Sequence, residues 1–150
     1  MNIDNTHLCQ HVIAPTLHYL EMYSPAALHM LLGVAKQESA GNPFCVDHQG
    51  LGLYQISSAQ HRSVWDNYLA FQPDLASRVR GLASQHQFLK DPDSELITNL
   101  RYSTAIALMI FLQSEADAKK LQTEPLNPYW HKLYHEEIAV EEEAVLAKAV

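Results

Sequence analysis

Cysteine is nearly absent from this 150-residue chain, which contains only Cys9 and Cys45. Two cysteines so far apart in the sequence do not require a disulfide framework. With no other cysteine present, a zinc site built on thiolates is not expected. We therefore expect Cys9 and Cys45 to be free, buried thiols.

Positive charge is also scarce, because 10 Lys and Arg residues stand against 17 Asp and Glu, which gives a formal net charge of −7. Phosphates repel such a chain, so a nucleic-acid partner is not expected. No run of about 18 apolar residues occurs, and we expect no membrane-spanning helix. Residues 1–6 lack a basic region followed by an apolar stretch, which argues against a signal peptide.

Apolar residues, by contrast, are plentiful and follow helical spacing. The hydrophobic fraction of 47% and the charged fraction of 18% are ordinary for a globular protein. The length predicts one domain, residues 1–150, with a mostly α fold. Helices are expected over residues 4–14, 16–22, 25–38, 58–69 and 94–114, and from residue 127 onward. A further helical segment is expected to begin at Pro73, with a stripe of buried apolar residues that ends at Leu89. Pro15 is expected to interrupt the first two, and residues 44–56 to form a small β-hairpin or an irregular loop.

The segment 94–114 is apolar nearly all round after Ala105. A helix of that kind has no face suited to water, so it must be covered on every side. We expect it to be the central buried helix of the domain, with the helix over 25–38 packed against it.

Glu38 stands at the polar end of the apolar segment 25–38. Ser24 is a suitable N-cap, Pro25 suits the first helical position, and Gly41 helps to end the helix. Glu38 therefore falls in the last turn, where the helix dipole and partial burial are expected to raise the pKa of a carboxyl group. Such a group suits general acid catalysis. The ordinary alternative is a solvated surface glutamate.

The residues around Glu38 resemble a known family. The first block comprises Gln37-Glu38-Ser39, Asn42-Pro43, Gly50 and Gly52-Leu53-Tyr54-Gln55-Ile56-Ser57. It is similar to the lytic transglycosylase domain of the goose-type lysozyme-like superfamily, with Tyr54 in place of a methionine. Two weaker blocks are Asn99-Leu100-Arg101-Tyr102 and Asn127-Pro128-Tyr129-Trp130 with Tyr134, the latter similar to phage members. The chain departs from the family pattern at three places. The spacing from Gly50 to Gly52 is one residue shorter than usual, Cys45 stands where the family has a small residue, and Asp47 stands where it has a serine.

The resemblance implies a lysozyme-like fold, a cleft and a peptidoglycan glycan strand as substrate. It makes Glu38 the catalytic residue, which protonates the glycosidic oxygen and then accepts a proton from the C6 hydroxyl of the sugar to give a 1,6-anhydro product. No cofactor and no metal are implied. The implied substrate-binding residues are Ser39, Asp47, Tyr54, Gln55, Tyr102, Trp130 and Tyr134.

These residues have different expected roles. Tyr54 and Gln55 form the cleft wall opposite Glu38, with the tyrosine stacked on a sugar and the amide bonded to it. Ser39 is expected to bond to backbone at the helix end rather than to substrate. Asp47 offers a second carboxylate, which would make the enzyme a hydrolase if it activates a water, or it is a turn residue. Core packing remains the alternative for Tyr54, Gln55 and Trp130.

Other readings stay open. A non-catalytic virion or tail protein could keep the same fold, and other virion proteins would then be its partners. His131 and His135 have i, i+4 spacing, but the glutamate and third ligand of a zinc site are missing, so metal binding is not expected. Without a signal peptide, we expect a virion-associated protein or one released to the cell wall by a phage route.

Overall fold

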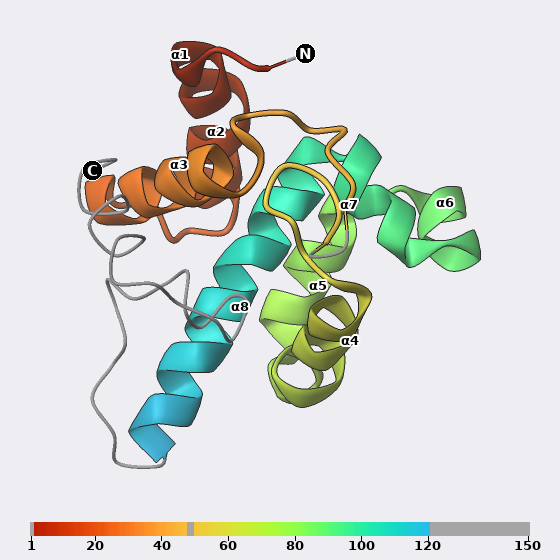
Figure 1. Cartoon of the computed structure of the whole chain (residues 1–150). Helices are drawn as coiled ribbons and strands as arrows, with labels where there is room; N and C mark the ends of the chain where they lie inside the picture. Colours follow the sequence, from red (N-terminus) through yellow and green to blue (C-terminus); the bar gives the residue numbers. More distant parts are fainter. Residues whose placement is uncertain (1, 48–49, 121–150) are drawn as a thin grey trace.

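The protein is mostly helical, as its sequence predicts. The computed structural model describes residues 2–47 and 50–120, and within these ranges it contains no β-strand. The helix α8 (Leu100–Lys120) runs through the middle of the molecule (Figure 1). The helices α1 to α3 lie on one side of it, and α4 to α6 lie on the other. The helix expected from residue 127 onward lies outside the described residues.

The N-terminal helical segment continues through Pro15, so the expected interruption there is wrong. It consists of α1 (Asn5–Leu8), a π-helical turn η1 (Cys9–Ile13) and α2 (Ala14–Tyr19). In a regular α-helix the His11 carbonyl would accept a hydrogen bond from residue 15, but proline has no N–H. Arg101 supplies the donors instead, with Nε at 3.3 Å and Nη2 at 3.1 Å from that oxygen. The wider π turn and the distant arginine together accommodate the proline.

The helix α3 (Pro25–Ser39) matches the sequence prediction closely. The Ser24 hydroxyl accepts a hydrogen bond from the N–H of Ala27 at 3.0 Å, as an N-cap should. The helix ends where Ala40 adopts the left-handed conformation, with φ of 55°. The N-terminal residues lie beside the C-terminal end of α3, where the N–H of Ile3 donates a hydrogen bond to the Gly41 carbonyl at 2.9 Å.

The helices that follow the loop begin with α4 (Ser58–Asn67), which continues into η2 (Leu69–Phe71). Ser57 and Gln60 form a reciprocal capping box, in which each side chain bonds the other residue's backbone N–H. This pattern fixes the start of α4 where the sequence predicts it.

The segment that opens at Pro73 is two helices, α5 (Pro73–Leu82) and α6 (Gln85–Lys90). The break turns Leu89 outward, to 76% exposure, so its expected place in a buried stripe is wrong. Distant groups stabilise the break. The Glu95 carboxylate accepts a hydrogen bond from the N–H of Ser84 at 2.5 Å, and the Asn99 amide donates to the Leu82 carbonyl at 2.8 Å.

The expected continuous helix over 94–114 is also interrupted. A short turn η3 (Pro92–Ser94) leads into α7 (Glu95–Thr98), and α8 starts after Asn99, whose backbone is extended. The chain bends by 109° between the segment formed by η3 and α7 and the helix α8. The Asn99 side chain caps α8 by accepting a hydrogen bond from the N–H of Tyr102 at 3.0 Å.

The first half of α8 is buried from Tyr102 to Ile110, which confirms its expected role as the centre of the core. α3 and α4 both contact α8. No single described helix is long and apolar enough to cross a membrane. The bent pair of η3 with α7 and α8 passes that test by length and composition alone.

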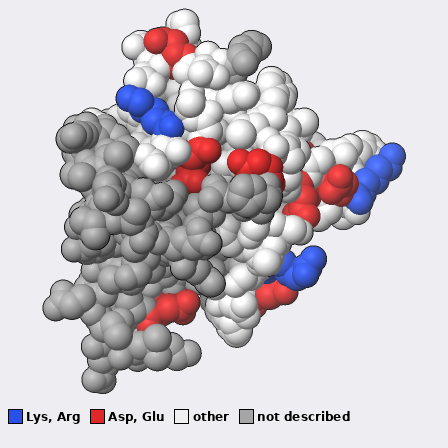
Figure 2. All heavy atoms as spheres, in the orientation of Figure 1, with Lys and Arg blue, Asp and Glu red and all other residues white. Residues whose placement is uncertain are grey.

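The surface carries little concentrated positive charge on the face drawn in Figure 2, where Lys and Arg side chains stand apart from one another. One exposed ion pair, between Arg78 and Glu21 at 3.1 Å, joins α5 to the end of the N-terminal segment. Exposed pairs of this kind add little to stability.

Candidate active site

Glu38 lies in the last turn of α3, as the sequence predicts. Its side chain is half-buried, and the Oε2 atom is shielded from solvent. The helix C-terminus adds partial negative charge beside it. The carboxyl group therefore sits in an environment very different from that of an exposed surface glutamate.

The next residue, Ser39, fastens the following loop to α3. Its hydroxyl lies 3.0 Å from the Ala35 carbonyl of its own helix and 2.6 Å from the Leu53 carbonyl. Both partners are acceptors, so they share one hydroxyl hydrogen. The expectation that Ser39 bonds to backbone is confirmed, and its hydroxyl has no hydrogen left to donate to a substrate.

The loop between α3 and α4 is irregular, one of the two forms expected for it. Isolated antiparallel bridges join Val46 to Leu51 and Leu51 to Ile56. Gln55 closes the loop from inside, because its amide nitrogen donates to the carbonyls of Cys45 and Gly52, each at 2.8 Å. Two side chains therefore hold the loop in place: Ser39 at the end of α3 and Gln55 within the loop itself.

Gln55 is completely buried and has an unusual backbone, with φ of +52°. Its two amide hydrogens point at carbonyls, so the orientation of the amide is fixed, and the remaining oxygen Oε1 is buried with no hydrogen-bond partner among the residues that the structure describes. The expected cleft-wall role is therefore replaced by a structural one for the amide nitrogen.

The two glycines of the loop are required by close backbone approaches. Gly52 has φ of +75°, and a Cβ atom there would collide with the carbonyl oxygen of Leu96 in α7. A Cβ atom at Gly50 would collide with the carbonyl of Gln55. At Gly52 the loop therefore packs directly against the backbone of α7, and neither glycine has room for a Cβ atom.

Tyr54 belongs to the core, so the expectation that it stacks on a sugar is wrong for this structure. The side chain has no exposed surface, and its hydroxyl lies 2.8 Å from Thr104 Oγ1 on α8. Burial raises the pKa of Tyr54. The tyrosine packs the loop onto the central helix.

The remaining predicted site residues are dispersed. Asp47 is exposed on the loop, and its backbone N–H donates to the Gly50 carbonyl at 3.2 Å. Tyr102, which we expected to contact Glu38 or the glycan, has no exposed surface for a glycan, and its hydroxyl bonds to His61 and Trp65. Trp130 and Tyr134 lie outside the described residues.

A polar depression of about 320 Å³ lies between α4 and α8. Its walls carry the amides of Gln60 and Gln113, the hydroxyl of Ser63 and the carboxylate of Asp117. Gln113 donates a hydrogen bond to the Ser63 hydroxyl at 3.2 Å across the depression. Neither Glu38 nor a residue of the loop from Gly50 to Ser57 is among the residues that line this depression.

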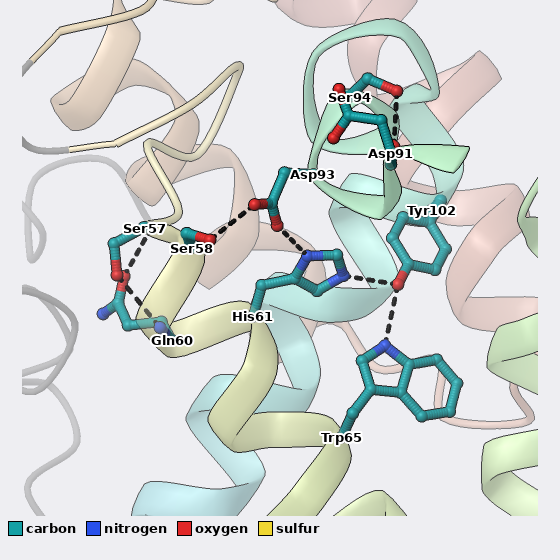
Figure 3. Close-up of polar contacts among 9 residues, drawn as sticks. All are labelled: Ser57, Ser58, Gln60, His61, Trp65, Asp91, Asp93, Ser94 and Tyr102. Atoms are coloured by element: carbon teal, nitrogen blue, oxygen red, sulfur yellow. Dashed lines mark hydrogen bonds and ion pairs between the residues drawn. The ribbon is translucent and has the colours of Figure 1, made fainter. Parts of the chain in front are cut away.

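A second polar cluster, which sequence reasoning missed, connects α4, η3 and α8 (Figure 3). His61 contacts Asp93 through Nδ1 at 2.8 Å and the Tyr102 hydroxyl through Nε2 at 2.6 Å. Trp65 donates its indole N–H to the same hydroxyl at 2.9 Å, and Ser58 donates to Asp93 at 2.5 Å. Ser58, His61 and Trp65 share one face of α4 at i, i+3 and i+7 spacing, but only the fold brings Asp93 and Tyr102 to that face.

The charge of Asp93 decides the direction of the hydrogen bonds at that end of the cluster. Partial burial acts to raise the pKa of Asp93, but the hydrogen bonds from Ser58 and His61 and the nearby cationic groups outweigh it and lower the pKa. The ionised carboxylate accepts hydrogen bonds from the Ser58 hydroxyl and from His61 Nδ1–H, and the Tyr102 hydroxyl, which accepts the indole N–H of Trp65, also bonds to His61 Nε2. Burial raises the pKa of Tyr102 and keeps the phenol protonated.

Every nitrogen of His61 is thus engaged, and the ring is only 3% exposed. A small cavity of about 200 Å³ adjoins the cluster, lined in part by Arg62, Phe88 and Pro92. The cluster fixes α4 against α8, and its histidine has no nitrogen available for acid–base chemistry on a substrate.

Removal of the Tyr102 hydroxyl should destabilise the protein measurably. In Tyr102→Phe, the indole N–H of Trp65 and Nε2 of His61 lose their partner inside the protein. We expect a loss of about 1–3 kcal/mol in the free energy of unfolding, the cost of a buried polar group left unsatisfied. Urea unfolding followed by circular dichroism measures it.

The matched control is Tyr19→Phe. The Tyr19 hydroxyl donates a hydrogen bond to the Arg78 carbonyl at 2.9 Å, but the side chain is 45% exposed, so water can replace the bond. Its expected effect is within about 0.5 kcal/mol. Equal effects of the two substitutions would show that the cluster contributes nothing beyond an ordinary surface hydrogen bond.

The cysteines are free, as expected, although both are half-buried rather than buried. Burial raises the pKa of the Cys9 thiol, which disfavours the reactive thiolate. Among residues 2–47 and 50–120, no group of three or more His, Cys, Asp or Glu side chains is arranged to hold a metal ion. His131 and His135 fall beyond these ranges.

Comparisons with known proteins give no match, whether with the models of protein families, with curated proteins or with solved structures. What the chain does must therefore follow from its own side chains and their arrangement.

Proposed function

We propose that this protein cleaves the β-1,4 glycosidic bond between the two sugars of peptidoglycan, as a lytic transglycosylase of lysozyme-like fold. The observation that carries the proposal is the position of Glu38. It is a half-buried carboxyl in the last turn of α3, and the next residue bonds a loop whose motif resembles that of the transglycosylase family.

The transglycosylase reaction requires one carboxyl group. Glu38 donates its proton to the glycosidic oxygen as the C1–O bond breaks and positive charge develops at the sugar ring, where the N-acetyl group assists. The C6 hydroxyl of the same sugar then attacks C1 and gives its proton to the Glu38 carboxylate. The product carries a 1,6-anhydro ring, no water is consumed, and the enzyme returns to its protonated state.

The fixed loop supports this role, because a general acid must be held within hydrogen-bond reach of the bond that it protonates. Ser39 and Gln55 hold the loop, and α8 supports it through Tyr54. The amides and hydroxyls of the depression between α4 and α8 suit the hydroxyls of a sugar chain. Export through a phage particle or a lysis route is part of the same proposal.

A non-catalytic role as a virion or tail component is the second candidate. The observation that favours it is the burial of Tyr54 and Tyr102, which removes two rings from the expected glycan-binding surface. A protein of this kind would keep the fold without turnover.

Mass spectrometry of muropeptides after digestion of purified peptidoglycan separates these functions. Anhydro ends on the products are the expected result. Reducing ends would identify a hydrolase, and absence of soluble products from a folded protein at neutral pH would favour the non-catalytic role.

We expect Asp47→Asn to change the rate of muropeptide release by less than about tenfold, since one carboxyl group performs both proton transfers. Asp47 is exposed on the loop, and the unfolding midpoint of the variant is measured in parallel, so that only folded protein is compared. A loss as large as that expected for Glu38→Gln, together with reducing-end products, would instead assign Asp47 as the base of a two-carboxylate hydrolase.

A further inference from the structure

A second cavity, of about 540 Å³, lies where the N-terminal segment, the α5–α6 connection and the corner between α7 and α8 meet. Its lining includes His11, Ser84, Gln87, Glu95, Thr98 and Arg101. This volume falls in the range of small-molecule sites, about 300–1,000 Å³. None of the chemistry assigned to Glu38 uses these residues.

Glu95 is the unusual group in this cavity, since its side chain is only 2% exposed. One carboxylate oxygen, Oε1, accepts the Ser84 N–H at 2.5 Å and lies 3.5 Å from the Asn99 amide nitrogen. No cationic side chain among the described residues lies within ion-pair distance of it. A buried carboxylate without a counter-charge is costly, and a cation that enters the cavity would offset that cost.

Arg101 provides the opposite charge on the same cavity wall. Its guanidinium is anchored to the His11 carbonyl through Nε and Nη2, so the group is held in one place before any ligand arrives. Nη1 makes no hydrogen bond within the described residues, and its two N–H groups suit a carboxylate.

The neighbouring polar groups are fixed as well. Thr98 donates its hydroxyl hydrogen to the Ser94 carbonyl at 3.1 Å, and the Gln87 amide nitrogen donates to the Ser94 hydroxyl at 3.0 Å. Within residues 2–47 and 50–120, no group donates a hydrogen bond to the side-chain oxygen of either residue, so both can act as acceptors. A cavity with positioned polar groups loses little entropy when it binds a ligand.

We propose that this cavity binds a small zwitterion, an amino acid or a short peptide with free ends. Glu95 binds the ammonium group and Arg101 binds the carboxylate. The proposal goes beyond glycan cleavage and does not depend on Glu38.

The test uses the full chain and three dipeptide probes: dialanine, N-acetyl-dialanine, which lacks the ammonium group, and dialanine amide, which lacks the carboxylate. Each is titrated into ¹⁵N-labelled protein at pH 7, with the amide signals of Ser84 and Arg101 as reporters. The Ser84 N–H bonds directly to Glu95, so its signal locates the binding event. Alanine itself, as a fourth probe, distinguishes an amino-acid site from a peptide site.

We expect dialanine to shift both reporters in a saturable way. Removal of either charge from the probe should weaken binding about ten- to a hundredfold, the effect of losing a hydrogen bond to a charged group. Glu95→Gln keeps the shape and the acceptor for the Ser84 N–H but removes the charge. It should weaken dialanine binding by a similar factor and leave the binding of N-acetyl-dialanine unchanged.

Glu115→Gln, which removes the same charge from α8 outside the cavity, is the control and should bind dialanine like the wild type. The comparison of probes on the wild-type protein stands even if Glu95→Gln does not fold. Absence of saturable dialanine binding at millimolar concentration, or equal affinities for the free and acetylated peptides, would overturn the proposal.

Discussion

Glu38→Gln should leave a folded protein with almost no activity. The amide has the size of the carboxyl group but can neither donate nor accept the proton that glycosidic cleavage transfers. We expect the rate of muropeptide release to fall about a hundred- to ten-thousandfold, the usual contribution of general acid–base catalysis. The unfolding midpoint should stay close to that of the wild type.

Glu21→Gln is the matched control, because it makes the same chemical change at a side chain that is 73% exposed. Its activity should equal that of the wild type. If a folded Glu38→Gln protein retains more than a tenth of wild-type turnover, Glu38 is not the catalytic residue, and the proposed function fails with it.

Gly52→Ala should have the largest effect on stability. The backbone at this position is in the left-handed region, where a Cβ atom costs about 1–2 kcal/mol. The added methyl group would also overlap the Leu96 carbonyl oxygen, which belongs to the backbone of α7 and cannot rotate away. We expect a total loss of at least about 3 kcal/mol in the free energy of unfolding, measured by urea denaturation.

Gly81→Ala provides the contrast. Gly81 lies within α5, where alanine favours the helix by about 0.8–1 kcal/mol. The nearest atom to the new methyl group is the hydroxyl at the end of the exposed Tyr19 side chain, which can move aside. Its effect should range from neutral to stabilising. A similar stability for both variants would contradict the tight fit of the loop on α7.

Local signals in the sequence predict the helices that are stabilised locally. α3 carries its own cap at Ser24, α4 carries a complete capping box, and α8 has too many apolar residues to lie anywhere but in the core. Glu38 falls at a helix end for the same reason. For these elements, residues three or four positions apart contain all the information that is needed.

Elements stabilised by distant residues are predicted poorly. Glu95 stabilises the break between α5 and α6, and Arg101 satisfies the His11 carbonyl that Pro15 cannot bond. The sequence also does not show which tyrosines are covered. Tyr54 and Tyr102 are suited to either a cleft or a core, and only the packing of the loop and of α4 on α8 decides that both are buried.

The bond from Arg101 to His11 has a consequence for the order of folding. The two residues are 90 positions apart, and they meet only after α8 has docked against the N-terminal segment. Contacts between such distant positions form late, because the chain must first lose the entropy of closing a long loop. We therefore expect the first twenty residues not to form the π-helical turn alone, and to reach their final shape only when the centre of the molecule is in place.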